Sequence, residues 1–278
     1  MLEAIKYTTI RDICITDFIV YDKEKTEALA EFCMRHGISF IPDRNRKSYW
    51  KLDGNKFTHI QELSPHVIIG PEELIFDETT INKFKNRNYD EVMFVVEDRL
   101  IKGVVHIVDY NNDNLYVELY RMLLSFENNL RNLLIQKKHS NEDFLNWLKK
   151  EGDKNYYYKN MYEQEVDDRA VQRRKNANPF QTFYLKDLMN FAQAEKLLNL
   201  SNNELNDITE LRNWVAHSKD VTTVKPDSDH PVYNITGLVK FIELSTSFFK
   251  SYESLELVLE EFQPANFSIL RKAIMNKE

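Results

Sequence analysis

Residues 115–138 read LYVELYRMLLSFENNLRNLLIQKK, and this stretch decides the fold class of the chain that follows it. Its apolar residues recur every three or four positions, which places them on one face of an amphipathic helix. That face consists of Leu119, Met122, Leu123, Phe126, Leu130, Leu133 and Leu134. Comparable patterns predict further helices over 141–149, 185–198, 203–217 and 235–262. We therefore expect an all-α bundle in the C-terminal part of the chain.

Two segments of this part do not follow a helical pattern. Residues 153–180 are rich in tyrosine, then charged, and fit no single element. Residues 219–233 contain two prolines and read as a loop.

Upstream, short apolar strands alternate with short helices, and the pattern occurs twice. The first copy predicts strand, helix and strand over 18–22, 24–35 and 38–43, with Gly37 ending the helix. The second copy predicts the same elements over 74–77, 80–86 and 92–96. A further strand follows each copy, at 47–53 and within 99–109. Tandem copies of this kind predict a pseudo-symmetric α/β unit.

Length and composition favour two domains in a chain of 278 residues, with the boundary between 112 and 113. Hydrophobic residues make up 42%, which is enough for packed cores, and only six glycines favour helix. The net charge of −7 argues against a general polyanion binder. Any contact with RNA must therefore come from a local basic patch.

The sequence also predicts a compartment. Two cysteines, Cys14 and Cys33, provide no disulfide framework and fit a reducing cytosol. The N-terminal residues lack the apolar core of a signal peptide, and no apolar run approaches the length of a membrane span. We expect a cytoplasmic protein without a membrane partner.

The candidate catalytic motif is Arg-Asn-Trp-Val-Ala-His at residues 212–217, late in a predicted helix. A guanidinium such as that of Arg212 can stabilise charge on a phosphate, and an imidazole such as that of His217 can transfer a proton. A ribonuclease that uses no metal needs both functions. Neither a metal-ligand spacing, a Gly-rich phosphate loop nor a Ser-hydrolase elbow is found in the sequence.

The tandem repeat, over about residues 8–112, resembles a cystathionine-β-synthase (CBS) domain pair. The best match is VVEDRLIKGVVHIVD at residues 95–109. The resemblance makes Asp109 the aspartate that accepts hydrogen bonds from a ribose, with Asp53 as its counterpart in the first copy. His106 stands where the family has Ser or Thr, which is a departure at the phosphate contact. The resemblance implies an adenine nucleotide as a regulatory ligand; the alternative is a pair that only mediates dimerisation.

The helical part resembles HEPN domains, helical bundles that include many bacterial ribonucleases. The match is Arg-x4-His at Arg212 and His217, with Asn213 directly after the arginine. A polar residue on the first helix often completes the site in this family, which makes Glu127 and Arg131 candidates. The resemblance implies a homodimer in which two motif helices pair around a two-fold axis, and it implies no cofactor for catalysis.

Helix geometry supports the need for a dimer. Residues five apart on an α-helix differ by about 140° in direction, so Arg212 and His217 do not share one narrow face. They converge if the helix end unwinds or if two motifs meet across an interface. In the competing structural interpretation, Arg212 pairs with Glu210 or another carboxylate, and His217 caps the helix, where a cation is favoured.

A basic cluster lies in the segment 153–180, at Arg169, Arg173, Arg174 and Lys175. Cations neutralise phosphates, and the tyrosines upstream of them, Tyr156–Tyr158 and Tyr162, can stack on unpaired bases. The alternative is a solvated helix face beside ordinary aromatic core.

The sequence thus predicts an α/β CBS-like pair over 1–112 followed by an all-α HEPN-like domain over 113–278. The expected function is metal-independent RNA cleavage that leaves a 2′,3′-cyclic phosphate, with a role in a toxin or phage-defence system. The rival interpretation is a nucleotide-sensing or scaffolding dimer without enzymatic activity.

Overall fold

The computed structural model describes residues 5–85, 92–222 and 233–261. The chain forms two compact units, which a single cut in the sequence does not separate. Unit 1 comprises residues 1–120 and 214–246, and unit 2 comprises 121–213 and 247–278. The expected boundary between 112 and 113 stays a prediction.

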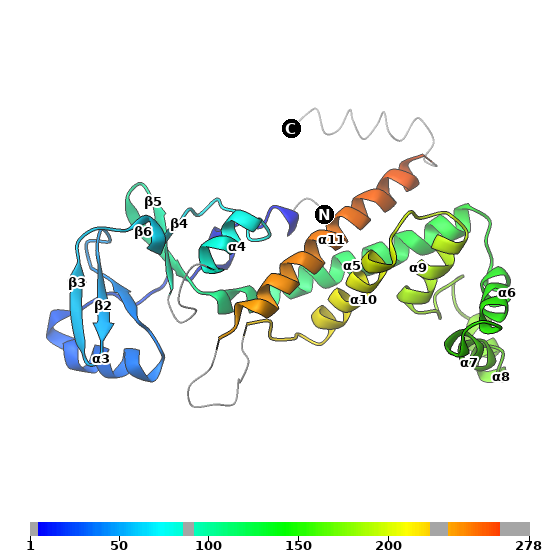
Figure 1. The fold of residues 1–278 in the computed structure, drawn as a ribbon, viewed down its shortest axis with the longest axis horizontal. Coiled ribbons are helices and arrows are strands. Elements are labelled where there is room, and N and C mark those ends of the chain that lie inside the picture. Colours follow the sequence, from blue (N-terminus) through cyan, green and yellow to red (C-terminus); the bar gives the residue numbers. More distant parts are fainter. Residues whose placement is uncertain (1–4, 86–91, 223–232, 262–278) are drawn as a thin grey trace. The chain divides into compact units, whose positions relative to one another are not determined.

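Unit 1 begins with the short helix α2 (Ile10–Ile13) and an antiparallel sheet. The sheet consists of β1 (Phe40–Pro42), β2 (Tyr49–Asp53) and β3 (Lys56–Ile60), in that order. It is preceded by a 3-10 turn (Lys23–Lys25) and α3 (Thr26–Arg35). Figure 1 shows α3 at the foot of β2 and β3. The helix and the first two strands were predicted from the repeat, and they are confirmed.

The second sheet has the order β4 (Ile68–Ile69), β5 (Met93–Glu97) and β6 (Leu100–Val105). Strand β4 pairs parallel with β5, and β5 pairs antiparallel with β6. Asp98 and Arg99 both have positive φ, at 53° and 62°, so a tight primed turn joins β5 to β6. Helix α4 (Glu78–Lys85) lies between β4 and β5 in sequence, and a 3-10 turn (Ile107–Asn111) follows β6.

The two sheets share one apolar core. Phe40 and Tyr49 from the first sheet meet Phe94 from the second, with ring centroids 6.5 and 5.0 Å from that of Phe94. Val67 and Ile101 complete the buried cluster. Burial of these side chains accounts for the near-continuous apolar runs of β1 and β5.

The predicted first strand of each copy is wrong. Residues 18–22 form no strand; the Tyr21 amide donates one backbone hydrogen bond to Pro42, and Asp22 caps the 3-10 turn. Residues 74–77 also form no strand, and Asp77 accepts a hydrogen bond from the Thr79 amide at the start of α4. The strand parallel to β5 is Ile68–Ile69, upstream of the predicted one. Strand β3 was not predicted.

The C-terminal part is helical, as expected. Its helices are α5 (Asp113–Gln136), α6 (Asn141–Gly152), α7 (Tyr156–Glu165), α8 (Asp168–Lys175), α9 (Leu185–Ala194), α10 (Asn202–Ala216) and α11 (Ile235–Glu260). Helices α7 and α8 occupy the segment that no pattern could assign. Most of the predicted 219–233 loop lies outside the described residues. The coarse class is therefore confirmed: strands and helices in the N-terminal part, helices in the C-terminal part.

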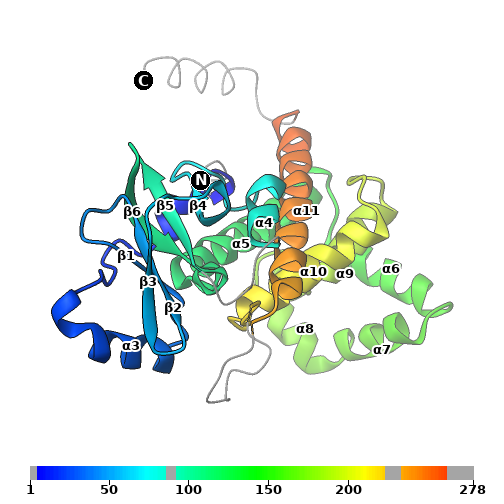
Figure 2. The same cartoon turned by 60° about the vertical axis from the view of Figure 1, so that its left-hand side comes forward.

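Helix α11 runs alongside α5 in unit 2 (Figures 1 and 2). Phe126 of α5 contacts Phe248 and Tyr252 of α11, with ring centroids 5.7 and 6.0 Å apart. The Ser125 and Tyr252 hydroxyls are 2.8 Å apart and hydrogen-bonded. In unit 1, the stacked rings of Tyr116 and Phe241 join the first part of the same two helices.

Four helices end in the same way, with one residue in the left-handed conformation and two backbone hydrogen bonds that close the last turn. For α10 these bonds run from the Ser218 amide to Val215 O and from the Lys219 amide to Trp214 O. The left-handed residues that end α3, α5, α9 and α10 are Gly37, Lys138, Lys196 and Ser218. Only the first of them is a glycine, the residue that adopts this conformation without steric cost.

Among the described residues, no helix is both long and apolar enough to cross a membrane.

Candidate functional site

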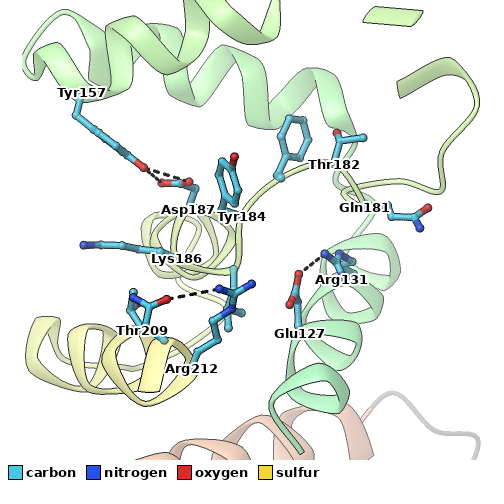
Figure 3. Close-up of a pocket in the computed structure, with 13 residues that line it drawn as sticks. Glu127, Arg131, Tyr157, Gln181, Thr182, Tyr184, Lys186, Asp187, Thr209 and Arg212 are labelled. Carbon is cyan, nitrogen blue, oxygen red and sulfur yellow. Dashed lines mark hydrogen bonds and ion pairs between the residues drawn. The ribbon is translucent and has the colours of Figure 1, made fainter. Parts of the chain in front are cut away.

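A cavity of about 410 Å³ in unit 2 collects most of the predicted catalytic side chains. We call it the Arg212 cavity. Figure 3 shows side chains from α5 and α10 facing each other across it, with α7, α9 and the loop before α9 completing the wall. Its lining residues are Glu127, Arg131, Tyr157, Gln181, Thr182, Phe183, Tyr184, Leu185, Lys186, Asp187, Thr209, Arg212 and Asn213.

Glu127 and Arg131 form an ion pair on α5, one helical turn apart, with side chains only 18% and 16% exposed. Arg131 also donates to Phe180 O and to the Asn128 side chain, both at 3.2 Å. The guanidinium is therefore held by three partners and its charge is balanced by Glu127. This pair shapes the wall of the cavity and adds little net charge to it.

Arg212 and Asn213 enter the cavity from the last turns of α10 and are exposed. The Arg212 guanidinium is 3.5 Å from the Asn213 side-chain oxygen. Within the part of the chain that the structure describes, no carboxylate forms an ion pair with Arg212, so the pairing with Glu210 or another carboxylate that the competing structural interpretation required is not formed. Lys186 on α9 is a second exposed cation at the cavity. Among the described residues neither Arg212 nor Lys186 forms an ion pair, although Lys186 acts electrostatically on Asp187, and two such exposed cations suit an anionic ligand.

Asp187 is a buried carboxyl group in the same wall, in the first turn of α9, with 0% exposure. The Tyr157 hydroxyl donates to both of its carboxylate oxygens, at 3.2 and 3.4 Å. Burial raises the pKa of Asp187 to about 6, against the opposing effects of the Tyr157 hydrogen bond and of Lys186. A carboxyl group whose pKa lies near neutrality, in a cavity with cations, is a candidate proton donor and acceptor.

Asp187 makes the stability of the protein depend on pH. Its pKa is about 6 in the folded chain and 3.8 for the ordinary group, so the folded state binds more protons between these values. Below pH 4 the carboxyl group is protonated in both states and does not lower the stability of the fold. The free energy of unfolding then falls by about 3 kcal/mol as the pH rises from 4 through 6. We expect Asp187→Asn to be more stable than the wild type at pH 8 by up to this amount, and equal to it at pH 4, in chemical denaturation.

Asp143 provides the matched control. Its pKa is lowered by hydrogen bonds from the Ser140 hydroxyl and amide, so it stabilises the fold above pH 4 and loses this effect as pH falls. Asp143→Asn should consequently lower stability at pH 8 and not at pH 3. Equal curves for wild type and Asp187→Asn at both pH values would contradict the burial of a charged Asp187.

The other predicted catalytic residue, His217, does not line the Arg212 cavity. It is the exposed residue that directly follows α10, between Ala216 and the left-handed Ser218. A cation is favoured at this negative end of a helix, which fits the structural interpretation of the histidine. The cavity thus brings together Arg212, Asn213, Glu127 and Arg131, but not His217 of the same chain.

Two of the three residues predicted to bind a nucleotide in unit 1, Asp109 and His106, form local capping hydrogen bonds. The Asp109 carboxylate accepts a hydrogen bond from the His106 amide at 2.7 Å, and the His106 ring accepts one from the Val108 amide at 3.3 Å. Burial raises the pKa of Asp109 to about 6. Asp53 is exposed at the hairpin between β2 and β3.

The basic cluster of α8 divides into two kinds of residue. Arg174 is only 9% exposed; it forms an ion pair with Glu165, donates to the Glu165 carbonyl oxygen, and lies over the Phe183 ring. It therefore holds α8 against its neighbours and is not a surface cation. Arg169, Arg173 and Lys175 are exposed, and the first two line a shallow surface hollow on α8.

Sequence reasoning did not single out Lys186 or Asp187. Asp187 follows Tyr184 by three residues in the pattern of an ordinary helix start, and acidic residues are common there. In the described ranges, no three His, Cys, Asp or Glu side chains come together as a possible metal site.

Comparisons with protein-family models, with curated proteins and with solved structures give no match for this chain.

Proposed function

We propose that the chain is a homodimeric endoribonuclease whose catalytic centre is the Arg212 cavity. The observation that carries this proposal is the meeting of Arg212, Asn213, Glu127 and Arg131 in one cavity. They come from two helices more than eighty residues apart in sequence, and the HEPN resemblance selects the same four. The exposed cations and the tyrosines Tyr157 and Tyr184 suit a single-stranded, phosphate-bearing ligand.

In the proposed reaction, the 2′-hydroxyl of the RNA attacks the adjacent phosphorus and the bond to the 5′-oxygen breaks. A protein side chain acting as general base removes the proton of the 2′-hydroxyl, and a proton is transferred to the departing 5′-oxygen. Arg212 stabilises the additional negative charge on the phosphoryl oxygens, and Asn213 orients its guanidinium. The products are a 2′,3′-cyclic phosphate and a 5′-hydroxyl.

Because His217 does not line the cavity of its own chain, the proposal places the partner's His217 there as the proton-transfer group. A two-fold arrangement would then produce two equivalent centres, each with Arg212 from one protomer and an imidazole from the other. Residues 1–112 act in this proposal as a CBS-like sensor of an adenine nucleotide, which shifts activity by binding one dimer arrangement more tightly than another.

The test is cleavage of single-stranded oligoribonucleotides by the purified full chain. We expect cleavage to persist in EDTA and to stop when the scissile position carries 2′-deoxyribose, because the attacking hydroxyl is then absent. The products should carry the cyclic phosphate. Loss of activity in chelator with recovery in magnesium, or cleavage of the deoxy-substituted strand, would show that the mechanism is wrong.

The rival function, a nucleotide-sensing or scaffolding dimer, is favoured by the position of His217 directly after α10, outside the Arg212 cavity of its own chain. It predicts that the chain cleaves no RNA with or without added AMP, ATP or NAD. Calorimetry with these nucleotides then separates a sensor, which binds one of them, from a scaffold, which binds none.

A further inference from the structure

We infer that a second cavity of unit 2 holds an unpaired nucleobase of the RNA, next to the phosphate bound by Arg212. This inference rests on the proposed function of the Arg212 cavity. The second cavity has a volume of about 390 Å³ and lies between α6, α7, α9 and the first residue of α10. We call it the Trp147 cavity; Trp147, Glu151, Tyr158, Asn190, Gln193 and Asn202 line it.

Its apolar wall consists of two aromatic rings that are fixed in place. Trp147 packs against the buried rings of Phe144 and Phe191, with centroids 5.5 and 5.6 Å from its own. Tyr158 meets it edge to face at 5.1 Å. Because Trp147 and Tyr158 remain partly exposed, they offer an ordered aromatic surface on which a base can stack.

The polar wall consists mainly of side-chain amides, which can both donate and accept hydrogen bonds. Gln193 donates to Leu200 O at 2.6 Å, and this fixes the side chain while its own oxygen remains an acceptor. In the described part of the chain, no hydrogen bond engages the side-chain amides of Asn190 and Asn202. Such groups match the edges of a base, whose own groups are neutral donors and acceptors.

The charge of the Trp147 cavity differs from that of the Arg212 cavity. No lysine or arginine is found among its described lining residues, and the one charged group, Glu151, receives a hydrogen bond from Lys154 at 3.1 Å. Phosphate is therefore disfavoured there, whereas a neutral aromatic ring is not.

The two cavities are neighbours along two helices. On α7, Tyr157 lines the Arg212 cavity and the next residue, Tyr158, lines the other. On α9, Lys186 and Asp187 line the first cavity and Asn190 lines the second. Four residues of helix advance by about 6 Å, which is the scale of one nucleotide. A strand whose phosphate lies at Lys186 in the Arg212 cavity can thus present its base to Asn190 in the Trp147 cavity.

The test measures binding of uncleavable, fully 2′-O-methylated oligonucleotides to the full chain by fluorescence anisotropy. Four strands differ only in the base next to a fixed central phosphate, and a fifth carries an abasic residue there. We expect the abasic strand to bind at least about tenfold more weakly than the best of the four, which corresponds to about 1.4 kcal/mol. The double variant Asn190→Ala, Asn202→Ala should lose the discrimination between bases.

Asn199→Ala is the matched control, because this exposed asparagine lies three residues before Asn202 and does not line the cavity. It should bind all strands as the wild type does. Arg212→Ala should weaken all strands alike and leave the order of bases unchanged. Base-selective binding without any RNA cleavage would overturn the proposed catalysis but retain the nucleobase site.

Two results would overturn the nucleobase site itself. One is equal affinity of the wild type for the abasic strand and the four others. The second concerns competition for the bound oligonucleotide. If free nucleosides do not displace it and an indole-bearing peptide does, the cavity binds a protein side chain and not a nucleobase.

Discussion

Replacement of Arg212 by alanine should reduce RNA cleavage by about a hundredfold or more while the fold survives. A cation that meets charge developed only in the transition state typically contributes this much. The side chain is exposed, and its contact with Asn213 is long, so its removal costs little stability. Single-turnover cleavage and a denaturation curve measure the two quantities. Arg212→Lys should recover part of the activity, because it keeps the charge but not the planar fork.

Mixing two inactive variants tests whether the centre is shared between protomers. His217→Ala should be as inactive as Arg212→Ala. In the proposed arrangement, a dimer of one chain of each kind retains one complete centre, so random mixing should restore roughly a quarter of wild-type activity. Lys149→Ala, at an exposed position outside both cavities, is the control and should change nothing. No recovery on mixing would place Arg212 and His217 of the same chain in one centre, or remove His217 from catalysis.

Replacement of Arg131 by alanine should destabilise the protein by roughly 3 kcal/mol, because it leaves the largely buried Glu127 without its charge partner. The lost hydrogen bond to Phe180 O adds to this cost. The double variant Glu127→Ala, Arg131→Ala should be more stable than Arg131→Ala alone. Urea denaturation of the two single variants and the double variant provides the coupling energy.

Lys154→Ala is the control for this cycle, since it breaks an ion pair in which the lysine is 66% exposed. Its cost should stay below about 1 kcal/mol. If Arg131→Ala folds as stably as the wild type but fails to bind RNA, Arg131 is a ligand contact and not a positioning residue. An unchanged fold with unchanged RNA binding would remove it from both roles.

The sequence predicted the long helices well, because their apolar faces extend over many turns and leave a strong periodic signal. The sequence did not predict helices α7 and α8 because each has a single buried residue, Met161 in α7 and Ala170 in α8. Their positions depend on contacts with other elements, such as the Arg174–Glu165 ion pair, which no local pattern reveals.

The short strands show the opposite problem. The apolar residues at 18–22 and 74–77 look like strands, but the aspartate at the end of each, Asp22 and Asp77, accepts a hydrogen bond from the amide two residues ahead and starts a helical turn. These aspartates therefore mark the starts of helical turns and not the ends of equivalent strands. The pairing strand Ile68–Ile69 is only two residues long, too short for any alternation to appear.

For the candidate site, the resemblance selected four residues that the fold does bring together, and the position of His217 shows where sequence spacing alone is insufficient. Asp187 could not be found from the sequence, because its distinction is burial beneath Tyr157, thirty residues upstream. A raised pKa of this kind arises from tertiary packing and has no local signature.

The ends of α5, α9 and α10 bear on how such variants can be studied. Lys138, Lys196 and Ser218 hold a conformation that is costly for any residue with a β-carbon. Glycine at these three positions removes that strain without touching either cavity, and each exchange can contribute up to about 1 kcal/mol. A chain carrying all three glycines should be more stable than the parent protein. Substitutions that would unfold the parent could then be studied kinetically in this more stable background.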